Sequence, residues 1–193
     1  MVRTIREEPG GGSRAGGIYP SADESDVVLR DGAAMHLRPI RYDDGPGLLA
    51  LYDRLSPESL HFRFFAVLAK DPEKAEYLTH VDYDRRYAIV AETAGAIVGV
   101  ARWERLPDRP SHAEVAFTVA DEFQGRGLGG LLFQRLAALA RAREIAVFTA
   151  EVLKNNERML RLFARTGLTS KTCDQGSTLT ILLALDPASL PPA

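Results

Sequence analysis

The sequence predicts one mixed α/β domain, and three patterns along the chain support this. Apolar residues recur at helical spacing early in the chain, over residues 44–55. Two β-rich runs, 87–93 and 97–106, then lie on either side of Ala94-Gly95, a pair typical of a hairpin turn. A strand, a long helix and a second strand follow at 112–119, 126–143 and 145–153. Two strands joined by such a crossover are expected to be parallel.

The remaining elements follow from local signals. Residues 34–40 read as a strand, and 27–29 as its partner across a glycine turn. Ser56 and Pro57 suit the cap and first position of a second helix, because a Ser side chain accepts amide bonds there and Pro needs no amide partner. Further predicted segments are a short helix over 72–80, a helix over 156–165 ending at Gly167, and closing strands at 169–173 and 179–185.

Composition limits the classes of function. The chain has 193 residues, 46% of them hydrophobic, which suits one packed domain. A formal net charge of -2 excludes a strong overall attraction to nucleic acid or to an anionic membrane. Cys173 is the only cysteine, so an internal disulfide is impossible, which is consistent with a cytoplasmic location. The four histidines do not stand at metal-ligand spacings, so we expect no bound metal.

The two ends of the chain differ in composition from the middle. Residues 1–24 are rich in Gly, Ser and Glu and poor in large apolar residues, so we expect a disordered leader. The proline-rich residues 187–193 predict a flexible tail. The folded domain is therefore expected to cover residues 25–186.

A glycine-rich run at the start of the long helix is the strongest functional signal. It comprises Gln124, Gly125, Arg126, Gly127, Leu128, Gly129 and Gly130. Bare amides at a helix N-terminus bind phosphate groups, and glycine lets a phosphate approach the backbone. Three glycines, Gly125, Gly127 and Gly130, also match a dinucleotide fingerprint, but the run does not turn directly off the first strand. The Gly-Lys-Ser/Thr end of a nucleoside-triphosphate loop is absent, and close packing alone is the remaining alternative.

The pattern Gln124-x-x-Gly127-x-Gly129 resembles the acyl-CoA pyrophosphate loop of the GNAT acetyltransferases. The order of elements from about residue 34 to 185 is also similar to that family. The resemblance is closest to the acetyltransferase domain of bacterial Pat-type protein lysine acetyltransferases. The segments that carry it are Leu37–Arg41, Leu55–Ser59, Arg63–Phe65, Val81–Arg85 and Ala113–Val119.

This resemblance implies a GNAT fold, with a mixed, mostly antiparallel sheet of about six to seven strands flanked by helices and splayed between the fourth and fifth core strands. It implies that Phe117, Thr118 and Val119 expose backbone groups to the pantetheine arm, with the Val119 N–H meeting the thioester oxygen. The amides of residues 125–130 then take the pyrophosphate. Arg126 either adds a charge-assisted contact or is a solvated residue at the helix start.

Glu114 is the predicted general base, because a lysine ammonium with a pKa of about 10.4 must lose a proton before attack. In the resembled domains a catalytic Glu occupies this position. Strand alternation places on one face His112, Glu114, Ala116 and Thr118. The apolar neighbours Ala113 and Val115 are expected to desolvate the carboxylate and raise its pKa. The alternative is a solvated Glu paired with Arg102, while His112 is a reserve base or relay, or else a turn residue.

Two further positions are compared with the family. Related enzymes use an Asn at the start of the last helix to contact the cofactor, which implies this role for Asn156. A plain N-cap, supplied by Asn155 or Asn156, is the alternative. Many GNAT enzymes carry a Tyr seven residues later as general acid, but this chain has Phe163 there. The thiolate then leaves with help from water or backbone donors, or Glu114 returns the proton.

We therefore expect an acetyl-CoA-dependent N-acetyltransferase that passes acetyl directly to a primary amine, with a protein lysine as the leading acceptor. Cys173 has no adjacent base and is not expected to carry an acyl group. A small amine, polyamine or aminoglycoside acceptor is the nearest alternative, and a non-catalytic acyl-CoA-sensing module is the alternative from another class. The expected partners are acetyl-CoA and the amine acceptor, without nucleic acid or membrane, for a monomer or homodimer.

Overall fold

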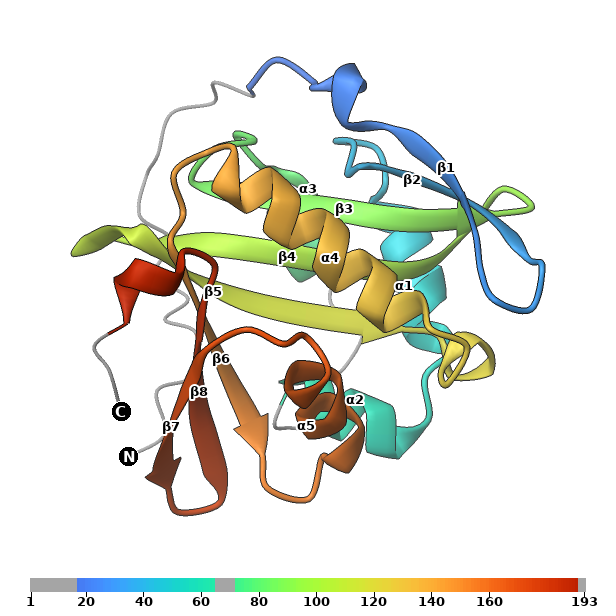
Figure 1. The fold of residues 1–193 in the computed structure, drawn as a ribbon. Coiled ribbons are helices and arrows are strands. Elements are labelled where there is room, and N and C mark those ends of the chain that lie inside the picture. The colour runs from blue at the N-terminus through green and yellow to red at the C-terminus, as the bar shows by residue number, and fades with distance from the viewer. Residues whose placement is uncertain (1–16, 65–71, 191–193) are drawn as a thin grey trace.

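The computed structural model describes residues 17–64 and 72–190 (Figure 1). Residues 1–16 of the predicted leader, Phe65 and the last three residues of the predicted tail lie outside the described residues. The helices are α1 (Gly45–Asp53), α2 (Pro57–Phe64), α3 (Pro72–Thr79), α4 (Leu128–Arg141) and α5 (Glu157–Ala164). The strands are β1 (Ser25–Val28), β2 (Ala34–Pro39), β3 (Arg86–Thr93), β4 (Ala96–Leu106), β5 (Arg109–Val119), β6 (Val147–Leu153), β7 (Ser170–Gln175) and β8 (Thr178–Ala184).

One mixed sheet organises the described residues. Its eight strands run in the order β1-β2-β3-β4-β5-β6-β8-β7. Neighbouring strands are antiparallel except β5 and β6, which are parallel and joined by α4, so the predicted crossover is confirmed. The predicted partner strand near residues 27–29 is present as β1, which brings the sheet to eight strands. The sheet is mostly antiparallel and open at the predicted splay between β5 and β6.

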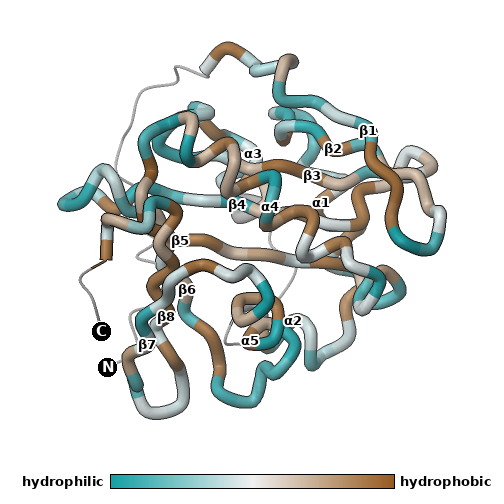
Figure 2. Tube along the Cα trace, in the orientation of Figure 1, coloured by the Kyte–Doolittle hydropathy of each residue, from teal (hydrophilic) through white to brown (hydrophobic). Residues whose placement is uncertain are grey.

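Helices cover both faces of the sheet. In Figure 1, α4 crosses the front of β3, β4 and β5, while α1 and α3 lie behind the sheet. The front core joins Leu132 and Leu136 of α4 to Phe117 of β5, and the rear core joins Leu48 of α1 to Val90 of β3. Figure 2 shows that β4 changes from hydrophobic to hydrophilic residues toward its C-terminal end. The rear face of the sheet therefore becomes polar where β4 and β5 run side by side near that end.

Local chemistry explains where several elements begin and turn. Ala94 and Gly95 both have positive φ angles, 50° and 75°, which is the geometry of the tight hairpin turn that the sequence predicted. Ser56 caps α2, because its Oγ accepts the N–H of Ser59 at 3.2 Å. The predicted long helix begins only at Leu128, because Gly127 has a φ of 95° and cannot continue a right-handed helix.

Residues 17–24 pack on the domain, although the composition predicted disorder up to residue 24. Asp23 accepts hydrogen bonds from the Tyr87 hydroxyl at 2.7 Å and from Arg143 at 2.8 Å. Tyr87 is fully buried and stacks on Trp103 with ring centroids 4.5 Å apart. The prediction failed for these residues because their stabilising contacts are polar and reach residues far along the chain, which composition does not reveal.

The described part of the predicted tail is also attached. Residues 187–189 form a 3-10 turn, and the Ser189 hydroxyl donates to the carbonyl of Ala146 at 3.0 Å. Among the described residues, no helix combines the length and apolar character that crossing a membrane requires.

Candidate active site

A gap opens between the two parallel strands directly after Glu114. The β5–β6 register pairs His112 with Val147, Ala113 with Phe148 and Glu114 with Thr149, and it ends there. Both strands continue beyond this point, β5 to Val119 and β6 to Leu153, and they diverge as Figure 1 shows. Glu114 therefore lies at the closed end of the splay.

Backbone groups of β5 face into this gap. The Ser111 carbonyl accepts from Ala146 on the β6 side, whereas the Ala120 N–H donates to Val98 on the β4 side. Peptide groups alternate in direction along a strand, so those of Phe117 and Val119 point toward β6, like that of Ser111. Beyond Glu114 the ladder no longer occupies that side. The gap is thus lined by peptide groups that can bind an extended polar chain.

The glycine run presents free amides at the far end of β5. Gly127 is the N-cap of α4, and no side chain caps this helix. The first helical bond runs from the Leu131 N–H to the Gly127 carbonyl, so the amides of residues 128–130 have no partner within the helix. A Cβ added at Gly125 or Gly127 would meet no protein atom within 4 Å, so the outer side of the loop is open. At Gly129 a Cβ would meet Leu162 at 3.1 Å, so this glycine allows α4 and α5 to pack closely.

The Gln124 side chain holds the glycine loop in place through hydrogen bonds to its neighbours. Its Nε2 donates to the Val119 carbonyl at 3.0 Å, to Asp121 at 2.8 Å and to the Ser59 hydroxyl at 3.2 Å. Its Oε1 accepts from Arg158 of α5. The shape of the loop depends on this one side-chain amide, which joins β5, α2 and α5. The contact of Gln124 with the cofactor stays a prediction.

Asp121 ties the same loop to the start of α2. Its carboxylate accepts from the Ser59 hydroxyl at 2.7 Å and from the Ser56 N–H at 3.0 Å. Burial raises the pKa of Asp121, but the hydrogen bonds from Ser59 and Ser56 outweigh this and leave the pKa below its ordinary value. The adjacent Glu122 pairs with Arg54, which follows α1. Sequence reasoning missed these links because their members lie more than sixty residues apart.

Arg126 has a protein partner that neither interpretation of the sequence included. Its guanidinium pairs with Asp31 in the β1–β2 turn and lies over the Phe123 ring, 4.8 Å from the ring centroid. The hydrogen bond from Arg126 lowers the pKa of Asp31. A carboxylate beside the guanidinium partly neutralises the charge that a phosphate contact would use.

Glu114 lies in a polar row on the rear face of the sheet. Its Cα partners are Glu104 on β4 and Thr149 on β6, and the carboxylate is partly buried. Arg102 is the predicted alternative partner of Glu114. Its Nη2 lies 4.0 Å from Oε2 of Glu104. Two carboxylates directly opposite each other repel, so the row favours a positively charged neighbour.

Among the described residues of β5 and β6, three buried polar atoms on this face have no hydrogen-bond partner. They are His112 Nδ1, Thr118 Oγ1 and Thr149 Oγ1. His112 belongs to β5, so its interpretation as a turn residue is wrong. Burial, with a smaller effect of Arg109, lowers the pKa of His112 and keeps the ring neutral at neutral pH. Sequence reasoning missed Thr149, because its position opposite Glu114 depends on the register between β5 and β6.

Helix α5 packs on the front face of the sheet through Phe163. The Asn156 side chain accepts the N–H of Met159 at 3.1 Å, so Asn156 rather than Asn155 is the N-cap. This contact engages its Oδ1. Phe163 is buried and packs against Phe117 with ring centroids 6.3 Å apart. Its ring fixes α5 against β5 but carries no proton that can be donated.

The acidic loop before β3 serves local structure. Asp82 accepts the N–H groups of Asp84 and Arg86, at 3.0 and 2.9 Å, and Asp84 pairs with Arg105 at 2.9 Å. The loop is therefore capped by its own carboxylates. Cys173 is exposed on β7, the edge strand beyond β8. No cluster suited to a metal ion is present among residues 17–64 and 72–190.

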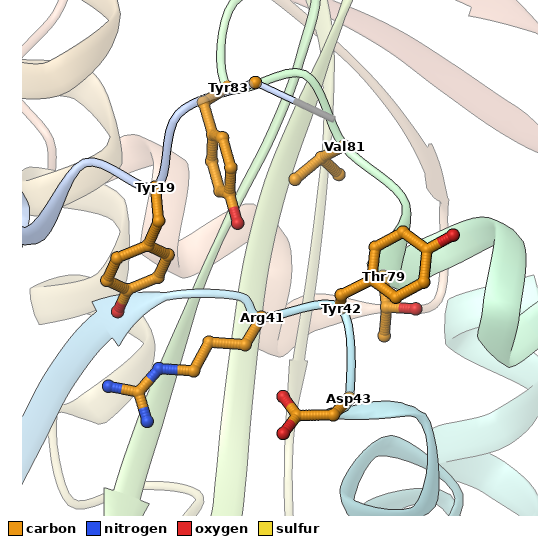
Figure 3. Close-up of a pocket in the computed structure, with 8 residues that line it drawn as sticks. Tyr19, Arg41, Tyr42, Asp43, Thr79, Val81 and Tyr83 are labelled. Carbon is orange, nitrogen blue, oxygen red and sulfur yellow. The ribbon is translucent and has the colours of Figure 1, made fainter. Parts of the chain in front are cut away.

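A separate cavity of about 360 Å³ lies where the N-terminal segment meets the ends of β2 and α3. Figure 3 shows the rings of Tyr19, Tyr42 and Tyr83 around it. Its remaining lining residues are Gly17, Arg41, Asp43, Thr79 and Val81. None of the predicted site residues lines this cavity, so it is distinct from the splay.

Comparison with known proteins identifies a family and relatives that are similar to this chain in sequence. The model of the acetyltransferase (GNAT) family matches residues 49–168. The chain is 34% identical over 156 residues to the acetyltransferase Pat of Mycolicibacterium smegmatis, covering 80% of this chain and 47% of that protein. It therefore spans about half the length of that relative.

Solved structures show the same architecture. The GNAT domain of PAT from S. lividans superposes with a TM-score of 0.81 at 35% identity, covering 86% of this chain and 99% of that one. The protein yncA from Salmonella typhimurium, solved with its cofactor acetyl-CoA, has a TM-score of 0.64 at 22% identity and supports the fold. That match covers 82% of this chain and 98% of yncA.

Proposed function

The chain belongs to the acetyltransferase (GNAT) family, and from this premise we propose that it transfers acetyl from acetyl-CoA to a protein lysine. One observation carries the proposal: the β5–β6 ladder ends at Glu114, while free helix amides lie at the other end of the same strand. The name of the M. smegmatis relative, an acetyltransferase Pat, agrees with the reaction class.

The layout supports one orientation for the cofactor. The amides of residues 128–130 and the open glycine loop would bind the pyrophosphate, and the peptide groups of Phe117 and Val119 would bind the pantetheine arm. A strand rises about 3.3 Å per residue, so Phe117 lies roughly 10 Å and Val119 roughly 17 Å along β5 from Glu114. An amine held by Glu114 is therefore nearer to Phe117. We assign the thioester oxygen to the Phe117 N–H, in place of Val119, and leave Val119 to the arm.

In the proposed reaction, Glu114 accepts protons from the acceptor amine and returns one to the leaving thiolate. A lysine ammonium loses two protons when it becomes an amide. In this proposal the first passes through Glu114 to water, which frees the lone pair of the nitrogen. The nitrogen attacks the carbonyl carbon, the C–N bond forms and the second proton moves to Glu114. The C–S bond breaks, and Glu114 returns that proton to the thiolate because Phe163 has none to give.

The test measures thiol release from acetyl-CoA with poly-L-lysine, spermidine or kanamycin as the acceptor. Wild type is expected to prefer poly-L-lysine, and Glu114→Gln to lower kcat by about 10²–10⁴-fold, the usual effect of losing a general base. Glu104→Gln is the matched control, because it removes a carboxylate from the neighbouring strand, and is expected to stay within about threefold.

The outcomes separate the candidate functions. Release with spermidine or kanamycin alone would assign a small-amine acceptor. Tight acetyl-CoA binding without thiol release from any acceptor would favour a sensing module. A Glu114→Gln rate within about threefold of wild type would show that another group is the base.

A further inference from the structure

Thr149 stands opposite the proposed base at the last pair of the β5–β6 ladder. The two residues are Cα partners in the parallel register, and paired residues project from the same face of a sheet. The Thr149 Oγ1 is buried and has no hydrogen-bond partner. Thr149 thus places a hydroxyl beside Glu114 at the point where the gap opens.

Packing does not explain a threonine at this position. A buried hydroxyl without a partner destabilises a fold, and native proteins leave few such groups. Valine has nearly the same shape and lacks the polar atom. The front-facing neighbours on the same strand, Phe148, Ala150 and Val152, are all apolar and buried. Thr149 lies on the opposite, rear face of β6 together with Glu114, and an unpaired hydroxyl there is typical of a group kept for a ligand.

Resting on the proposed function, we propose that the Thr149 hydroxyl binds the acceptor nitrogen. Its oxygen accepts one N–H of the lysine while the Glu114 carboxylate accepts another. Two acceptors on adjacent strands fix two N–H directions, so the nitrogen lone pair is directed into the gap where the thioester lies. Thr149 takes no proton in this step and remains a hydroxyl throughout. Its ligand class is a primary amine, in neutral or ammonium form.

The two unpaired atoms of β5 are placed less well for this role. His112 precedes Glu114 by two residues, on the side away from the opening of the gap. Thr118 lies roughly 13 Å along β5 from Glu114, near the groups assigned to the pantetheine arm. Within residues 17–64 and 72–190, only Thr149 combines a register position opposite Glu114 with an unpaired buried hydroxyl.

The experiment compares Thr149→Val, Thr149→Ala and Thr149→Ser in steady-state thiol release with acetyl-CoA and poly-L-lysine. Thr149→Val and Thr149→Ala are expected to lower kcat/KM for poly-L-lysine about 10-fold or more, because hydrogen bonds to charged groups are strong. The KM for acetyl-CoA is expected to stay within about twofold, and Thr149→Ser to recover the rate to within about threefold. Thr172→Val on the exposed strand β7 is the control.

A thermal melt accompanies the kinetics. Thr149→Val is expected to melt no lower than wild type, because it removes an unpaired polar atom without leaving a cavity. If the wild-type protein is active and Thr149→Val and Thr149→Ala both keep its kinetics, this inference is overturned and the proposed function is left intact. A changed KM for acetyl-CoA alone would also overturn it. A wild type without thiol release would defeat the proposed function and this inference together.

Discussion

The two ends of strand β5 satisfy their polar groups in opposite ways. At the C-terminal end, the side chains of Gln124, Asp121 and Arg126 all have protein partners, and the helix amides are left free. Near Glu114, the backbone ladder is complete up to the splay, and buried side-chain atoms are left without partners.

This difference separates binding from chemistry. A diphosphate carries a fixed charge, so rigid backbone donors held by their neighbours suit it. Proton transfer needs groups that can change their partners during the reaction, and such groups are side chains. We therefore expect substitutions at the two ends to have distinct kinetic signatures, and the following changes test this from the largest effect to the smallest.

The difference between the kinetic roles of the two ends of β5 is expected to be clearest for Glu114→Gln. This substitution should lower kcat by about 10²–10⁴-fold while leaving acetyl-CoA affinity nearly unchanged, because the carboxylate lies at the other end of β5 from the amides proposed to bind the phosphates. Calorimetric titration of acetyl-CoA into both proteins measures the affinity. A large loss of affinity together with kcat would mean that Glu114 shapes the cofactor groove, and the proposed separation would fail.

Gly127→Ala is the reciprocal change. A Cβ at a φ of 95° is strained and would occupy open space on the outer side of the loop. We expect the KM for acetyl-CoA to rise about 10-fold, with the free energy of unfolding lowered by about 1–2 kcal/mol.

Gly176→Ala is the matched control for that change, with a φ of 83° and equally open surroundings in the β7–β8 turn. It should lose similar stability and keep the KM of wild type. Equal KM values for acetyl-CoA in the two variants would show that the glycine loop does not take part in cofactor binding.

Gln124→Ala tests whether the glycine loop needs the side-chain hydrogen bonds of Gln124 to bind the cofactor. The amide bonds to Val119, Asp121 and Ser59 are lost, so we expect the free energy of unfolding to fall by about 1–3 kcal/mol. The KM for acetyl-CoA should rise several-fold. Urea unfolding and initial rates measure both, with the exposed Gln134→Ala on α4 as control. Loss of stability with unchanged KM would make the residue purely structural.

The smallest expected effect is the pH dependence of Asp121. Its folded pKa lies below the ordinary value of about 3.9, so the folded state binds fewer protons than the unfolded state near that pH. Its contribution to stability is therefore fully present above about pH 4 and is lost as the pH falls through the folded pKa. Asp121→Asn should be less stable at neutral pH and flatter in acid, as urea midpoints will show. Parallel curves for both proteins would contradict this.

Neighbouring residues were sufficient to predict most elements. The Ala94-Gly95 hairpin, the Ser56 cap and the parallel crossover all follow from signals within a few residues, and the structure confirms them. Composition failed at residues 17–24, because Asp23 is held by Tyr87 and Arg143, sixty-four and one hundred and twenty residues away.

By itself, the sequence determined the glycine loop and the strand that carries Glu114, because turn geometry and side-chain alternation depend on adjacent residues. Only the tertiary structure decided their partners: Asp31 for Arg126, Ser59 for Asp121, and Thr149 opposite Glu114. These pairs arise from strand register and helix packing, which bring together residues distant along the chain. Local pattern therefore specifies which groups are available, and packing specifies which of them meet.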